Sequence, residues 1–232
     1  MAAAGSGERL GAGGPKAFVP LAGRPLVEWS LEAFARAQSV GPVIVAVPAG
    51  CEDRVGDAAA AVVGGDSRSE SVAAGLERVE TELVAVHDAA RPLVTAELID
   101  ELIEKLLDRP DAAAVIAAAP LTDTVKRARE PRPANGEFPH GGPTVAETVS
   151  RDHLWAAQTP QVFRTAALRE SLDTDPPLVA VATDDAMLVE KAGGKVLIHP
   201  SPAKNLKVTT PLDLRIAELL LARERTDGPE SQ

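Results

Sequence analysis

The sequence predicts an α/β protein with a mostly parallel sheet, and three observations carry this prediction. Segments with a helical repeat of apolar residues alternate with short apolar runs along most of the chain. These runs are continuous, as expected of parallel strands that are buried on both faces. Apolar residues make up 45% of the 232 residues, which is enough to build a core. Sheets of this class bind ligands outside the carboxyl ends of their strands.

The first part of the chain has the clearest alternation. Residues 26–38 have an amphipathic helical pattern, and residues 43–47 form an apolar run that Pro48 closes. A further helix is expected over residues 52–61, followed by a short strand at residues 62–63. This order of elements is typical of βαβ units with right-handed crossovers.

Caps and apolar runs predict the elements that follow. Ser67 and Glu70 match a capping box ahead of a helix over residues 71–80. Thr95 and Thr183 precede two further helices and are expected to cap them. The remaining predicted elements are strands at 83–87, 112–118 and 195–198 and helices at 96–107, 165–171, 184–191 and 211–225.

Residues 121–150 interrupt this rhythm. The part from 130 to 143 is rich in proline, glycine and charge and has no apolar period, so it is either a disordered insert or an arm. The alternation resumes afterwards. We therefore expect a single domain over residues 1–225 and a disordered tail at 226–232.

The composition excludes several classes of function. A formal net charge of -10 argues against a broad nucleic-acid surface, which needs concentrated positive charge. Cys51 is the only cysteine, so an internal disulfide and a CxxC motif are excluded. No apolar run reaches the roughly 18 residues of a membrane span, and no secretory signal pattern is present. We expect a cytoplasmic protein with neither nucleic-acid polymers nor membranes as partners.

The first sixteen residues hold the strongest candidate for an anion-binding loop. Gly5 and Gly7 let backbone N–H groups approach a phosphate closely, and Arg9 and Lys16 are the only cations in the stretch. Two cations beside such a loop suggest a nucleoside triphosphate. The spacing lacks the third glycine of a dinucleotide fingerprint and the GK[ST] end of a P-loop. A flexible tail stays open as the alternative.

Polar residues after the predicted strands add a second group of candidates. Asp88 directly follows one strand and suits Mg²⁺, which prefers one or two carboxylates together with substrate phosphates. An ordinary turn residue is the alternative for Asp88. His87 is a packed histidine, a base or a metal ligand, and Arg91 either binds phosphate or pairs with Asp88. An anion-binding rim would also include hydroxyls and cations that singly are typical of a solvated surface, namely Thr124, Arg151 and Lys207.

At this point the chain resembles a known family. Seven strings occur in the order found in 2-C-methyl-D-erythritol 4-phosphate cytidylyltransferases: AAGSGERLG with a following PK, GGDSRSESV, VHDAARP, DTVK, LWAAQTPQVF, ATDDA and NLKVT. The resemblance covers residues 2 to about 213. It implies a three-layer, Rossmann-like fold of the nucleotide-diphospho-sugar transferase type. It also implies that residues 121–150 form a β-arm through which two subunits make a homodimer.

The resemblance implies a role for each matched residue. The catalytic cations that hold the triphosphate would be Arg9 and Lys16. The nucleotide CTP would be bound by Ala3, Ala4, Gly5, Gly7, Gly65, Asp66 and Ser71. The methylerythritol phosphate would be bound by Asp88, Arg91, Thr124, Arg151, Thr183 and Lys207. Asp88 would hold Mg²⁺, and Thr124, which lies in the arm, would serve the site of the partner.

The implied reaction transfers CMP from CTP to 2-C-methyl-D-erythritol 4-phosphate and releases pyrophosphate. A phosphate oxygen of the second substrate attacks the α-phosphorus of CTP in line, and positioned cations offset the repulsion between two polyanions. The alternatives are a cytidylyltransferase for another polyol phosphate, such as ribitol 5-phosphate, and a non-catalytic nucleotide-binding protein. The glycine spacing excludes a nicotinamide dehydrogenase.

One departure from the family pattern concerns the start of the sequence. The first loop of the family normally follows an apolar strand in the middle of the sheet, whereas only residues 1–4 precede the loop here. We therefore expect the first strand to be missing from this sequence. Either the start codon is assigned too far downstream, which the complete set of remaining motifs favours, or the protein lacks a core element.

Overall fold

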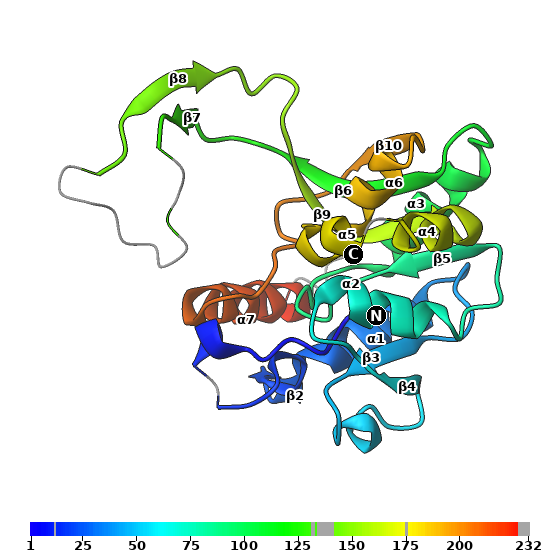
Figure 1. The fold of residues 1–232 in the computed structure, drawn as a ribbon. Coiled ribbons are helices and arrows are strands. Elements are labelled where there is room, and N and C mark those ends of the chain that lie inside the picture. Colours follow the sequence, from blue (N-terminus) through cyan, green and yellow to red (C-terminus); the bar gives the residue numbers. More distant parts are fainter. Residues whose placement is uncertain (12, 131–132, 134–141, 175, 227–232) are drawn as a thin grey trace, which may run out of the picture.

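A central sheet lies between two groups of helices in the computed structural model (Figure 1). The structure describes residues 1–11, 13–130, 133, 142–174 and 176–226. One face of the sheet is covered by α1 (Leu26–Arg36) and α3 (Ala96–Leu107). The other face is covered by α2 (Arg68–Leu76), α4 (Thr165–Leu172) and α6 (Asp185–Lys191). The expected three-layer α/β fold is confirmed.

The sheet is mixed. Its largest part has the order β10 (Val196–Pro200), β6 (Ala114–Pro120), β9 (Trp155–Arg164) and β5 (Leu83–Val86). β10 runs parallel to β6, whereas β9 runs antiparallel to both of its neighbours. A separate parallel pair is formed by β3 (Ile44–Val47) and β4 (Ala60–Val63).

β6 shows why the predicted strands are apolar throughout. Ala114 and Ile116 belong to the core cluster under α2, α4 and α6, while Val115 and Ala117 belong to the cluster under α1 and α3. Successive side chains of a strand point to opposite faces, so a strand between two helical layers needs apolar residues at every position.

The N-terminus lies inside the fold, between β3 and β5 (Figure 1). Ala2 makes isolated parallel bridges to Ala46 on one side and to Asp88 on the other. The N–H of Ala2 donates to the carbonyl of His87 at 2.8 Å, and the N–H of Ala3 donates to the carbonyl of Ala46 at 2.8 Å. The first residues therefore fix the start of the glycine-rich loop to both strands.

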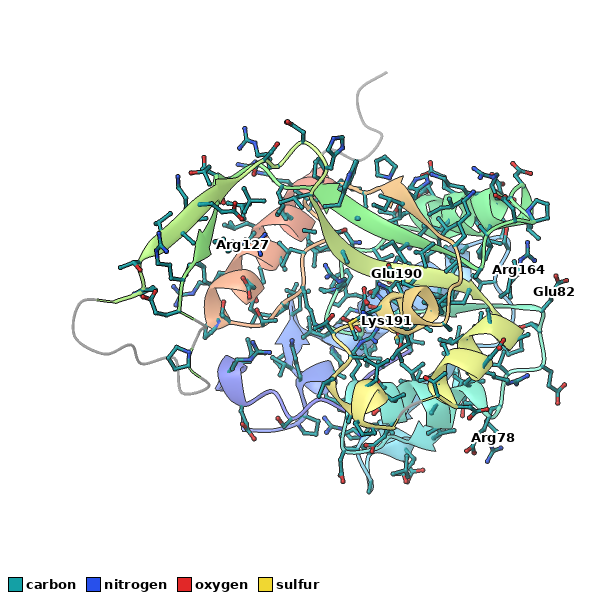
Figure 2. All side chains as sticks on the ribbon, turned by 45° about the horizontal axis from the view of Figure 1, so that its top comes forward. Arg78, Glu82, Arg127, Arg164, Glu190 and Lys191 are labelled. Carbon is teal, nitrogen blue, oxygen red and sulfur yellow. The ribbon has the colours of Figure 1, made fainter. Side chains whose placement is uncertain are left out.

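Residues 121–150 contain an antiparallel pair of strands, β7 (Val125–Ala128) and β8 (Val145–Val149), which stands away from the body of the protein in Figure 1. Arg127, labelled in Figure 2, pairs with Glu147 across the two strands at 2.5 Å. Most of the proline- and glycine-rich part that was expected to be an insert or arm lies outside the described residues.

Shorter elements complete the chain. The short strands β1 (Pro20–Leu21) and β2 (Arg24–Pro25) pair with each other, and α7 (Pro211–Thr226) packs against β1. The rest are the 3-10 helices η1 (Glu8–Leu10), η2 (Lys16–Phe18) and η3 (Glu52–Arg54) and the helix α5 (Pro176–Val181). No helix in the described part of the chain is long and apolar enough to cross a membrane. Of the expected tail, residues 227–232 lie outside the described residues.

Two predictions about elements were wrong, and one long strand was missed. The helix expected at 52–61 is only the single turn η3, because Gly56 takes φ +71° and the following residues pair with β3 as β4. The cap of α6 is Asp184, whose side chain accepts from the N–H of Met187, and not Thr183. The sequence did not predict β9, whose ten residues include Pro160 and buried polar side chains.

Candidate functional site

The glycine-rich loop folds back on itself at the carboxyl end of the sheet. The N–H of Lys16 donates to the carbonyl of Gly5 at 3.0 Å, which closes the loop. Gly7 takes φ +77°, where a side chain would be strained and would also meet the backbone of Lys16. Leu10 is buried in a core cluster with β1 and α7 and anchors the middle of the loop. The flexible-tail alternative is thus excluded for the described residues of this segment.

A second turn faces this loop. A Cβ on Gly64 would lie 2.6 Å from the Cβ of Ala4, and a Cβ on Gly65 would lie 2.3 Å from the Cβ of Glu70. Glycine is therefore required for the close approach of this turn to the loop and to α2. The capping box of Ser67 and Glu70 is confirmed.

Two cations hold the carboxylate of Asp88. Its Oδ1 lies 3.0 Å from Nε of Arg68, and its Oδ2 lies 2.7 Å from Nζ of Lys207. Burial opposes ionisation, but the two cations outweigh burial and hold the pKa of the Asp88 carboxyl well below its usual range. Asp88 is therefore an anion at any pH at which the protein would work.

Arg68 also binds a second carboxylate. Its Nη1 donates to Oδ2 of Asp185 at 2.6 Å, and Asp185 is fully buried. Burial raises the pKa of Asp185, whereas the two carboxylates outweigh the burial of Arg68 and raise the pKa of its guanidinium. Nη2 of Arg68 is buried without a hydrogen-bond partner among the described residues.

A relay of hydrogen bonds fixes the backbone of Asp88. Its N–H donates to Oγ1 of Thr159 at 3.0 Å, and this hydroxyl lies 3.1 Å from Nδ1 of His87. Nε2 of His87 lies 3.2 Å from the carbonyl of Arg91. Because the carbonyl can only accept, Nε2 carries the proton and the Thr159 hydroxyl donates to Nδ1. His87 is therefore a buried neutral histidine that supports the strand end; burial lowers its pKa to about 3.

Asn205 holds the segment that carries Lys207. Its Nδ2 donates to Oε1 of Gln158 at 3.0 Å and to the carbonyl of Thr159 at 2.9 Å. The guanidinium of Arg91 donates to the carbonyl of Asn205 at 2.8 Å. These bonds place the segment of Lys207 so that its ammonium group reaches the carboxylate of Asp88.

The glycine-rich loop, the turn at Gly65, Arg68, Asp88 and Lys207 line a cavity of about 320 Å³, which we call the loop cleft. Of the predicted site residues, the structure brings together in its lining Ala3, Ala4, Gly5, Gly7, Arg9, Lys16, Gly65, Asp66, Ser71, Asp88 and Lys207. Burial, together with Lys207 and Arg9, lowers the pKa of Lys16 to about 8. Four cations line the loop cleft at the carboxyl end of the sheet: Arg9, Lys16, Arg68 and Lys207.

Four predicted residues lie outside the lining of the loop cleft. The guanidinium of Arg91 is held by backbone carbonyls of Asn205 and Ala157. Thr124 is exposed and immediately precedes β7. Arg151 is exposed and donates to the carbonyl of Thr122 at the base of the strand pair β7–β8. The remaining one, Thr183, is exposed ahead of α6.

Asp88 is the residue of the loop cleft that would hold a divalent cation, and in this structure its two oxygens are paired with Arg68 and Lys207. Asp88 supplies an ionised carboxylate in the cleft wall, which is the donor type that Mg²⁺ prefers. No group of three or more His, Cys, Asp or Glu side chains in the described part of the chain could hold a metal. The other ligands of an ion at Asp88 would therefore be phosphate oxygens and water.

The sequence did not single out Arg68, Asp185, Thr159 or Asn205. One signal could have found Arg68: it follows the N-cap Ser67 directly, and a cation in the first turn of a helix is unfavourable. Such a residue needs a compensating carboxylate. Thr159 and Asn205 carry no comparable local signal, since their partners are 72 and 46 residues away.

Comparison with known proteins gives a consistent result. The sequence profile of the family described as 2-C-methyl-D-erythritol 4-phosphate cytidylyltransferase matches residues 1–223. A relative of that name from Streptomyces coelicolor is 43% identical over 240 residues, covering 97% of this chain and 85% of the relative. One from Alkaliphilus metalliredigens is 36% identical over 244 residues, covering 100% of this chain and 95% of the relative. The crystal structure of the enzyme from Thermus thermophilus aligns with a TM-score of 0.74 and 36% identity, covering 91% of this chain and 95% of that one.

Proposed function

The chain belongs to the family of 2-C-methyl-D-erythritol 4-phosphate cytidylyltransferases, and we propose that the loop cleft is where it carries out the reaction of that family. The reaction joins CMP from CTP to 2-C-methyl-D-erythritol 4-phosphate, which gives 4-diphosphocytidyl-2-C-methyl-D-erythritol and pyrophosphate. The observation that carries the proposal is the pairing of Arg68 and Lys207 with Asp88 in a cleft that Arg9 and Lys16 also line, because a transfer between two polyanions needs concentrated positive charge beside an ordered anchor.

The nucleotide half of the proposed site is the N-terminal side of the loop cleft. Arg9 and Lys16 hold the triphosphate as catalytic cations. The loop residues Ala3, Ala4, Gly5 and Gly7 present their backbone to it, and Gly65, Asp66 and Ser71 recognise cytosine and ribose. Support comes from the common lining of these residues and from the close approach of the Gly64–Gly65 turn to the loop.

The second substrate is proposed to bind on the other side of Asp88. Its proposed binding residues are Lys207 and Arg91, together with Thr124, Arg151 and Thr183. Lys207 already pairs with a carboxylate in this structure, so an incoming phosphate competes for an ammonium group that is positioned in advance.

The chemistry needs no general base. A phosphate oxygen of methylerythritol phosphate is already an anion, and it forms a bond to the α-phosphorus of CTP while the bond to the bridging oxygen of the β-phosphate breaks. The electron pair leaves with pyrophosphate. Lys16 and Arg9 stabilise the charge that develops on the leaving phosphates. Asp88 would hold Mg²⁺, which supplies charge neutralisation between the two substrates.

We further propose that the chain works as a homodimer through the strand pair β7–β8. Support comes from the exposure of this pair and its position away from the body of the protein (Figure 1). Thr124 at its base would then complete the site of the partner. The reaction is proposed to take place in the cytoplasm, the compartment that supplies CTP.

Mixing two defective variants tests the shared site. Lys16→Ala and Thr124→Ala should each lose activity, whereas re-formed mixed dimers contain one intact site. Mixing them should restore up to about one quarter of the wild-type rate. No recovery in mixtures in which two different affinity tags show that mixed dimers have formed would contradict the role of Thr124.

The catalytic proposal is tested by incubating the purified chain with CTP and methylerythritol phosphate, with Mg²⁺ or with excess chelator. Release of pyrophosphate together with the diphosphocytidyl product only when Mg²⁺ is present supports it. Equal rates in both conditions would overturn the role of the metal, and absence of product would overturn the reaction.

A further inference from the structure

A chain of ion pairs runs from the interior of the protein into the loop cleft. Asp185, in the first turn of α6, accepts from Nη1 of Arg68 at 2.6 Å, and Nε of Arg68 donates to Oδ1 of Asp88 at 3.0 Å. The other oxygen of Asp88 lies 2.7 Å from Nζ of Lys207. Arg68, Asp88 and Lys207 line the loop cleft, whereas Asp185 does not. Asp185 therefore reaches the cleft through Arg68.

The local structure of α6 does not require a carboxylate at position 185. The cap of the helix is the preceding residue Asp184, whose side chain accepts from the N–H of Met187 at 3.0 Å. Asp185 is fully buried, and its neighbours on α6 belong to an apolar core cluster. Its Oδ1 has no hydrogen-bond partner among the described residues. Because burying a carboxylate costs free energy unless it is paired, the pair with Arg68 accounts for this residue.

Arg68 makes fewer bonds to Asp88 than its shape allows. An arginine and a carboxylate frequently form two parallel bonds, and the side-on form of this pair uses Nε together with Nη2. Here Nε reaches Oδ1 of Asp88, but Nη2 is buried without a hydrogen-bond partner in the described part of the chain. The oxygen that Nη2 would take, Oδ2, is paired with Lys207 instead. The second bond between Arg68 and Asp88 is thus left unmade.

The bond to Asp185 explains this incomplete pairing. A guanidinium group is planar and rigid, so the directions of its N–H groups are fixed relative to one another. A rotation that brought Nη2 of Arg68 toward Asp88 would pull Nη1 away from Asp185. Asp185 lies in a helix that packs on the core, so it cannot follow this movement. It therefore holds Arg68 in the position that leaves one oxygen of Asp88 to Lys207.

We propose that Asp185 is a positioning residue of the loop cleft: by holding Nη1 of Arg68, it limits Arg68 to one bond with Asp88 and keeps Oδ2 of Asp88 as the anchor of Lys207. This role rests on the proposed function, in which Lys207 binds the second substrate. The ammonium group of a lysine sits on a flexible stem and needs an anchor to be in place before a phosphate arrives. Without Asp185, Arg68 takes both oxygens of Asp88, and Lys207 loses its anchor.

Two substitutions separate the hydrogen bond of Asp185 from its charge. Asp185→Leu has a similar shape but offers no acceptor to Nη1 of Arg68. Asp185→Asn removes the charge and keeps an oxygen that accepts from Nη1. The matched control is Glu190→Leu, which changes an exposed acidic residue on the same helix (Figure 2). The readouts are the KM values for both substrates, measured well below the Tm of each variant, and the crystal structures of the unliganded variants.

The kinetic test is a split between the two KM values. We expect Asp185→Leu to raise the KM for methylerythritol phosphate at least about tenfold, the scale of losing one positioned bond to a charged group. The KM for CTP should change by less than about twofold, because Arg9 and Lys16 hold the triphosphate. Asp185→Asn and Glu190→Leu should keep both KM values within about threefold of the wild type. A purely structural role would lower the Tm of Asp185→Leu without this split, and that result would overturn the proposal.

The crystal structure of unliganded Asp185→Leu tests the geometric step whichever reaction the cleft carries out. Nε and Nη2 of Arg68 should bond to the two oxygens of Asp88, and Nζ of Lys207 should lie more than about 4 Å from Oδ2. This rearrangement in a protein whose wild type forms no product would overturn the proposed function and still support the positioning role.

Three results would contradict the positioning role itself. The first is a set of unchanged contacts at Asp88 in Asp185→Leu. The second is an equal rise of the KM for methylerythritol phosphate in Asp185→Leu and Asp185→Asn, which would assign the effect to charge alone. The third is a failure of both Asp185→Leu and Asp185→Ala to fold, which would show that Asp185 serves the fold and not the cleft.

Discussion

The Nε of Arg68 donates to Oδ1 of Asp88 across 3.0 Å, and this bond ties the first turn of α2 to the end of β5. The same guanidinium reaches Asp185 in the first turn of α6 at 2.6 Å. Three elements that are far apart in the sequence therefore meet at one side chain. The position of Asp88 in the loop cleft depends on this arginine.

Arg68→Met should destabilise the fold by about 3 kcal/mol, because it leaves the buried carboxylates of Asp88 and Asp185 without their common partner. Urea unfolding measures the change. The matched control is Arg36→Met, which removes an exposed ion pair with Glu32 and should lower the free energy of unfolding by less than about 0.5 kcal/mol. Adding Asp185→Asn to the Arg68 variant should recover part of the loss. Equal stability of the two single variants would contradict the role of Arg68.

The loop cations should dominate the rate of the reaction. We expect Lys16→Ala and Arg9→Ala each to lower kcat by at least about 10²-fold, the scale of losing a donor that stabilises developing charge. Lys191→Ala, at the end of α6 and outside the loop cleft, is the control and should keep the wild-type rate. Full activity of both loop variants would show that the loop assignment is wrong.

The lowered pKa of Lys16 predicts an alkaline limit to activity. Because burial, Lys207 and Arg9 lower this pKa to about 8, the ammonium loses its proton as the pH rises through that value. The kcat/KM for CTP, which reports the free enzyme, should therefore fall up to about tenfold per pH unit above it. Lys16→Arg should move the limit to higher pH. An unchanged profile in this variant would assign the limit to another group.

His87 should make the fold sensitive to acid. Its pKa in the folded chain is about 3, whereas an unfolded histidine titrates near 6.5. Between these values the unfolded chain binds a proton that the folded chain does not, so stability falls as the pH decreases through this window, by up to about 1.4 kcal/mol per unit.

Urea unfolding at about pH 7.5 and about pH 5.5 checks this prediction. The loss of stability on acidification should be smaller by about 1 kcal/mol in His87→Gln than in the wild type. His153→Gln, which changes an exposed histidine, should keep the wild-type loss. A loss of stability in His87→Gln as large as in the wild type would contradict the buried neutral state of His87.

Much of the fold could be predicted because its strands are buried on both faces. The runs that became β3, β5 and β6 are apolar at every position, and Thr95 caps α3 as expected. β9 could not be predicted in this way. Pro160 argues against a central strand, and Gln158, Thr159 and Gln161 are polar although buried. Each of them has a hydrogen-bond partner in a distant segment, Asp88, Asp184 or Asn205, so no local pattern marks them.

The candidate site shows the same division. Local spacing pointed to Gly5, Gly7, Arg9 and Lys16, which line one cleft. Asp88 was found from its place after a strand, but its partner Arg68 comes from a capping box 20 residues earlier in the chain. Residues that line such a cleft can be predicted from local sequence patterns. Residues that hold them in position depend on the packing of separate elements and cannot.

A competition assay tests the central claim most directly. The purified protein is given limiting CTP with Mg²⁺ and equal concentrations of 2-C-methyl-D-erythritol 4-phosphate and ribitol 5-phosphate, and both products are quantified by mass spectrometry. We predict that 4-diphosphocytidyl-2-C-methyl-D-erythritol is the dominant product. Dominance of the ribitol product, or formation of neither product, would contradict the account.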